Sequence, residues 1–175
     1  NSTDIQTLVL AAGVSQSSGG IGAAVVVNVL DTDVAASVEG NVDAKGDVAV
    51  SAVNNASSAG HKFTILNQEL MGQQNVEFES PEITAIAAAG GGSQSGVGIA
   101  GSFIINHYEM NTEAAVAKTA KIITDGNISV SAVSDTTIKN VAGSLSASGG
   151  SVAVGPASDV TILNKNTVAT VNSSS

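Results

Sequence analysis

An imperfect internal repeat is the feature that most constrains how this chain can fold. Residues 46–53 (GDVAVSAV) return as residues 126–133 (GNISVSAV), 80 positions later. Val26-Val27-Asn28 returns as Ile104-Ile105-Asn106, 78 positions later. Repetition at a fixed spacing predicts like structural units that stack on one another. We divide the chain into three copies, of which the third is partial: residues 1–53, 54–133 and 134–175.

Within each copy the hydrophobic pattern has a period of two, which is typical of β-strands with one buried face. Ile128, Val130 and Ala132 alternate with serines, and the matching residues of the first copy alternate in the same way. We therefore expect four side chains to be buried in matching columns: Val48, Val50, Ile128 and Val130. Glycine and serine clusters predict corners between strands. The asparagines at equivalent places are interpreted as turn residues at these corners: Asn28, Asn106 and Asn164.

These patterns predict an all-β fold, a β-solenoid in which strands of successive coils stack in parallel. Aromatic residues make up only 2% of the chain, so the interior must be narrow and filled by small aliphatic side chains. Residues 1–175 are expected to form a single domain with two or three coils per copy, at roughly 20 residues per coil. A β-sandwich is the alternative, although its thicker core would normally require larger side chains. In the third copy, Gly155-Pro156 predicts a bulge.

Composition excludes several classes of function. The net charge is −9, all six basic residues are lysines, and there is no cysteine. Nucleic-acid binding requires a basic surface or aromatic stacking platforms, so we expect no nucleic-acid partner. Without cysteine, no disulfide, thiolate metal site or cysteine nucleophile can form.

Candidate catalytic and metal-binding residues are few. His61 and His107 lack a third partner at a readable spacing. The pairs Asp31/Asp33 and Glu77/Glu79 could line a carbohydrate groove, since glycosidases use two facing carboxylates. Calcium could bridge such acids, but no calcium-binding loop motif is present. Gly96 to Gly101 fits Gly-x-Gly-x-x-Gly but is followed by a strand pattern rather than a helix. We expect no enzyme activity, cofactor or metal site, with a carbohydrate-active β-helix enzyme as the alternative.

Three stretches resemble the repeats of leukotoxin-type filamentous adhesins, which are large exported bacterial proteins similar to filamentous haemagglutinins: residues 83–92, 97–102 and 126–132. The resemblance implies a right-handed parallel β-helix and a segment of a longer protein that is secreted or held on the bacterial cell surface. The implied function is structural and adhesive, a rigid shaft used in cell adhesion and virulence. A host-cell or matrix protein or glycan is one candidate partner. The terminal coils of a solenoid are unpaired strand edges, so we also expect end-to-end stacking with other repeats of the chain or with other copies. A passive scaffold within a secreted leukotoxin is a further alternative.

Residues 61–81 break the repeat pattern. The second copy carries about 25 residues more than the repeat spacing requires, and the Ala/Gly/Ser bias disappears there. The segment is either one more coil or a lateral excursion that packs on the shaft. Apolar, non-repeating elements on a repeat scaffold suit partner binding. The candidate partner contacts are Phe63, Leu70, Met71 and Phe78.

Overall fold

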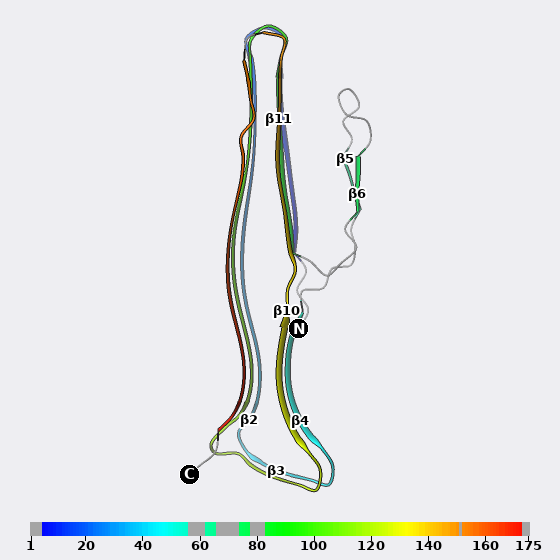
Figure 1. The fold of residues 1–175 in the computed structure, drawn as a ribbon, viewed down its shortest axis with the longest axis vertical. Helices are drawn as coiled ribbons and strands as arrows, with labels where there is room; N and C mark the ends of the chain where they lie inside the picture. Colours follow the sequence, from blue (N-terminus) through cyan, green and yellow to red (C-terminus); the bar gives the residue numbers. More distant parts are fainter. Residues whose placement is uncertain (1–4, 56–61, 66–73, 78–82, 151, 173–175) are drawn as a thin grey trace.

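The computed structural model describes residues 5–55, 62–65, 74–77, 83–150 and 152–172. These residues form an all-β structure without a helix. In particular, the described part of the chain contains no helix long and apolar enough to cross a membrane. The molecule is elongated and narrow, with two long walls of strands that run side by side and a short closing side at one end (Figure 1).

The chain makes three successive passes around this outline. The first pass consists of β1 (Ile5–Ser15), β2 (Gly19–Val38), β3 (Asn41–Ala44) and β4 (Val48–Asn55). The second consists of β7 (Ile83–Ser93), β8 (Val97–Val116), β9 (Lys121–Thr124) and β10 (Ile128–Asp135). The third consists of β11 (Ile138–Ser148), β12 (Val152–Val154) and β13 (Ala157–Val171). Between the first two passes lie β5 (Lys62–Ile65) and β6 (Gln74–Glu77).

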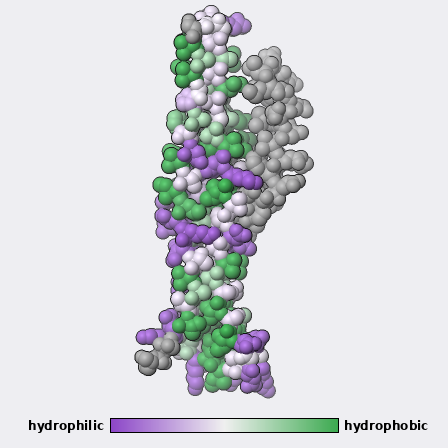
Figure 2. Space-filling model, viewed as in Figure 1, coloured by the Kyte–Doolittle hydropathy of each residue, from purple (hydrophilic) through white to green (hydrophobic). Residues whose placement is uncertain are grey.

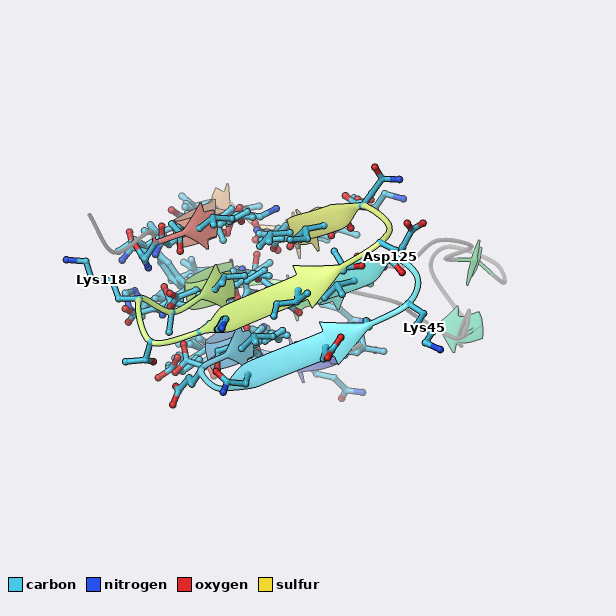
Figure 3. All side chains as sticks on the ribbon, turned by 90° about the horizontal axis from the view of Figure 1, so that it is seen from below. Lys45, Lys118 and Asp125 are labelled. Carbon is cyan, nitrogen blue, oxygen red and sulfur yellow. The ribbon has the colours of Figure 1, made fainter. Side chains whose placement is uncertain are left out.

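Strands pair in parallel with their equivalents in the neighbouring pass. One long wall has the order β1-β7-β11, and the other has β8 between β2 on one side and β12 and β13 on the other. The pairs β3–β9 and β4–β10 complete the outline. Seen from below, the passes lie in layers (Figure 3). Lys45, Lys118 and Asp125 project outward there, at the turns that flank the short side (Figure 3).

The predicted coil length of roughly 20 residues is wrong. Ile5 lies opposite Ile83, and Ile83 lies opposite Ile138, so paired residues are 78 and then 55 positions apart. The reason is that β2 and β8 each continue for 20 residues without a turn. One whole copy therefore makes one pass. The predicted bulge at Gly155-Pro156 is also absent from the register, because both Val154 and Ala157 lie opposite the β8 residue 55 positions earlier.

Glycines bring the two walls together near one end of the outline. A methyl group on Gly20 would overlap the carbonyl oxygen of Gly92, and one on Gly22 would overlap that of Gly90. The described glycines, some of which were expected at corners, all have a φ outside the left-handed region. Their role here is close backbone approach, which any side chain would prevent.

The interior follows the predicted alternation. Val26 is buried and Val27 exposed, and this pattern continues along β2 and β8. Val48 lies opposite Ile128 and Val50 opposite Val130, so the predicted columns are present. Val50 is buried, Val48 and Val130 are half-buried, but Ile128 is 48% exposed. The expectation for Ile128 is wrong because β10 pairs only with β4, which leaves its other edge uncovered.

Candidate functional site

The candidate contacts in residues 61–81 are only partly described. Phe63 lies in β5 opposite Val76 of β6, and these two strands pair antiparallel with each other. Every other described strand pair is parallel. Leu70, Met71 and Phe78 lie outside the described residues. The proposed contact surface of this segment therefore stays a prediction.

The acidic pairs considered for carbohydrate chemistry are placed differently from one another. Asp31 and Asp33 lie on the exposed outer side of β2, and Asp31 is opposite Glu109 of β8. Glu77 ends β6 opposite Lys62, while Glu79 lies outside the described residues. Asp31 and Asp33 of β2 thus face outward together from one side of the sheet, whereas a glycosidase needs two carboxylates that face each other across a sugar.

The other candidate catalytic, metal-binding and phosphate-binding residues are the two histidines and the glycine-rich segment 96–101. His107 is half-buried on β8, opposite Val29 and Ile162, and His61 lies outside the described residues. Gly98 and Gly101 lie inside β8, so this glycine-rich segment opens a strand and supplies no helix N-terminus for a phosphate. Among the described residues, no group of three His, Asp or Glu side chains could hold a metal.

A ladder of polar side chains crosses the interior from one pass to the next. Thr7 Oγ1 donates to Asn28 Oδ1 at 2.8 Å, and Asn28 Nδ2 donates to Asn106 Oδ1 at 3.0 Å. Asn106 Nδ2 then donates to Asn140 Oδ1 at 3.1 Å and to Thr161 Oγ1 at 3.2 Å. Asn106 is fully buried. Asn28 therefore links the first two passes, and Asn106 links all three.

This ladder corrects the interpretation of the asparagines as corner residues. Asn28 and Asn106 lie in the middle of β2 and β8 and point inward. Asn164 does not belong to the ladder, because it is opposite Glu109, and Thr161 is the residue opposite Asn106. A buried side chain must satisfy its polar groups, and asparagines stacked in register do so with each other.

The ladder reaches a carboxylate at the third pass. Asn140 Nδ2 donates to Asp159 Oδ2 at 3.0 Å and to Thr161 Oγ1 at 2.7 Å. Beside it, Tyr108 is fully buried, in register between Leu30 and Leu163. Burial is the main cause that raises the pKa of the Tyr108 phenol; the Asn28 side chain lowers it by a smaller amount, and the negative charge of Asp159 raises it. The polar interior is thus neutral at its centre and charged at one end.

The outer side of the β2–β8–β13 wall carries a broad apolar surface that the sequence analysis missed. Its side chains stand in register on neighbouring strands; for example, Val27 is opposite Ile105, which is opposite Val160. We define the outer apolar face by its exposed members: Ile21, Val25, Val27, Val29, Val97, Ile99, Phe103, Ile105, Val152, Val154, Val160 and Ile162. Farther along the same side of β2 and β8, exposed acids replace them: Asp31, Asp33, Glu109 and Glu113.

One sequence signal could have revealed this face. From Ile21 to Leu30 nearly every residue is apolar, as in strands that have apolar residues on both faces. The end of the stack differs from the outer apolar face. Viewed along the stacking direction, its surface shows hydrophobic and hydrophilic residues mixed together (Figure 2). The outer apolar face exceeds the scattered apolar residues of an ordinary surface, and such faces are typical of binding sites.

No protein-family model, curated protein sequence or solved structure matches this chain.

Proposed function

We propose that this chain is a rigid β-helical shaft, a right-handed parallel β-solenoid, within an exported bacterial surface adhesin or filament. The observation that carries the proposal is the in-register parallel pairing of β2, β8 and β13 over most of their length. Backbone hydrogen bonds in such a stack run along its axis, so each pass templates the next.

The interior chemistry supports a structural role. Residues of like character stand in columns, such as Ala36, Ala114 and Ala169. The Asn28–Asn106 hydrogen bond fixes which residues face each other, since a shift by one residue would turn every inward side chain outward. A shaft needs this fixed register more than it needs a reactive group.

The outer apolar face supports the adhesive part of the proposal. A shaft without a binding surface would be expected to carry polar residues on both outer sides. Val29 and Ile21 are 72% and 70% exposed, so an apolar partner surface gains contact there without rearrangement of the stack. Host-cell or matrix proteins, or neighbouring segments of the longer protein, are the proposed partners.

The cellular location can be tested with antibodies raised against the purified chain. In the producing bacterium, the proposal expects labelling of intact cells, and protease added outside the cells should remove the label. A cytoplasmic protein of the same cells serves as the control for membrane integrity. Labelling that requires permeabilised cells would overturn the proposed surface location.

A further inference from the structure

The free edge of β13 carries two inward-facing charges. β13 pairs with β8 and with no second strand in the described part of the chain. Asp159 continues the column formed by Val26 and Ile104, and Lys165 continues the column formed by Thr32 and Met110. Both charged residues are exposed, since no strand of the described residues lies on the far side of β13.

These charges decide how a second copy can stack on this edge. If β2 of a second copy continued the stack in the same parallel register, Val26 would cover Asp159 and Thr32 would cover Lys165. Each charge would then be buried without an opposite charge, which is strongly unfavourable. Inward-pointing charges are a recognised means of protecting a sheet edge from such pairing. Head-to-tail stacking of identical copies is therefore disfavoured at β13.

Antiparallel pairing of β13 with β13 of a second copy avoids the burial of unpaired charges. When two β13 strands pair antiparallel about Ile162, Asp159 of each copy stands opposite Lys165 of the other, because the two residues lie three positions on either side of Ile162. Directly opposite residues in an antiparallel pair point to the same side. Both charges then meet opposite charges inside the joined stack.

We propose that two copies of this chain associate tail to tail through antiparallel β13 strands, with two Asp159–Lys165 ion pairs across the two-fold axis. The inference rests on the proposed β-solenoid shaft, whose strand β13 offers an edge for a second copy, and it assigns the direction in which that copy stacks. Such an interface is isologous, as in most symmetric dimers, since the same strand serves both copies.

The local contacts hold both charges in place for this role. Asp159 accepts a hydrogen bond from Asn140 Nδ2, and Lys165 Nζ donates to the carbonyl oxygen of Ser134 at 2.6 Å. Pro156 does not obstruct the edge. Its carbonyl oxygen accepts a hydrogen bond from Ser102 N of β8. Because the backbone N and C=O of a strand residue point to the same side, the N–H that Pro156 lacks would also have pointed toward β8 and not toward the free edge.

The test uses charge exchange in the full chain, with mass measured by analytical ultracentrifugation. The unaltered chain should dimerise, and more weakly as salt is raised, since salt screens exposed ion pairs. Asp159→Lys alone and Lys165→Asp alone should each be monomeric, because each places like charges opposite one another. An equimolar mixture of the two variants should form a heterodimer, since opposite charges then meet at both positions.

Asp31→Lys is the matched control, because it reverses an exposed acid on β2, away from the β13 edge, and should leave the dimer unchanged. Circular dichroism of each variant shows whether it is folded. Two monomeric variants that stay monomeric when mixed, or single variants that still dimerise, would overturn the tail-to-tail assignment. Neither result bears on the antibody labelling of intact cells, so the tail-to-tail dimer can be refuted while the proposed surface location stands. Dimers that tighten with salt would instead indicate association through the outer apolar face and would also overturn the assignment.

Discussion

Asn28 and Asn106, which are 78 positions apart in the sequence, share a hydrogen bond of 3.0 Å in the interior of the stack. Asn28 is only 9% exposed and Asn106 is fully buried. The same amide of Asn106 also reaches the third pass through Asn140. One side chain thus connects all three passes, which makes it the central element of the register.

Replacing Asn106 by alanine should lower the free energy of unfolding by roughly 2–4 kcal/mol. The substitution leaves Nδ2 of the buried Asn28 and Oδ1 of the half-buried Asn140 without their partner. Urea denaturation measures the change. Asn111→Ala on the outward side of β8 is the matched control and should alter stability by less than about 0.5 kcal/mol. Equal losses for the two variants would contradict a structural role for the ladder.

Gly20→Ala and Gly22→Ala should each destabilise the fold severely, by about 3 kcal/mol or more. The added methyl groups would overlap backbone carbonyl oxygens of β7, which cannot move as a flexible side chain can. Gly143→Ala is the control, because a methyl group there meets no atom within 4 Å. Thermal melts followed by circular dichroism compare the three. A harmless Gly20→Ala would mean that the walls lie farther apart.

Tyr108 should titrate above the usual tyrosine range. It is the only tyrosine in the chain, so the ultraviolet absorbance of tyrosinate reports this residue alone. Burial raises its pKa in the folded state, and the folded chain therefore keeps a proton that the unfolded chain loses near pH ~10. Its contribution to stability is complete below that pH and is lost as the pH rises through the folded-state pKa.

The control for this titration is Tyr108→Phe, which keeps the ring and removes the ionisable group. Its stability should fall less steeply in the alkaline range than that of the unaltered chain. The comparison separates the contribution of the phenol from that of every other ionisable group in the chain. An ordinary titration curve for folded Tyr108 would show that the phenol is exposed to water.

Val27→Lys and Ile105→Lys should reduce binding of the apolar dye ANS without lowering the melting temperature by more than a few degrees. Both side chains belong to the outer apolar face and are 60% and 47% exposed, so lysine can extend into water. Val26→Lys, one position along β2, is the opposite case and should unfold the chain because Val26 is buried. If Val27→Lys were as damaging as Val26→Lys, the outer face would be covered.

The sequence alone predicted which residues pair. The repeat match of Val26-Val27-Asn28 with Ile104-Ile105-Asn106 is the observed register of β2 and β8. The match of residues 46–53 with 126–133 is likewise the register of β4 and β10. Parallel stacking places equivalent residues of successive passes side by side, so repeated sequence converts directly into spatial neighbours.

Only the tertiary structure decided where the chain turns and what fills the interior. The alternation of Val25, Val26 and Val27 is compatible with either face inward, because all three are apolar; the packing of β1 and β7 against β2 determined that Val26 is buried. Asparagine suits a turn by local preference, yet Asn106 lies in mid-strand because Asn28 and Asn140 satisfy its amide across the stack. Local sequence cannot report a hydrogen-bond partner that arrives from another pass, and that long-range partner is what placed the polar ladder inside.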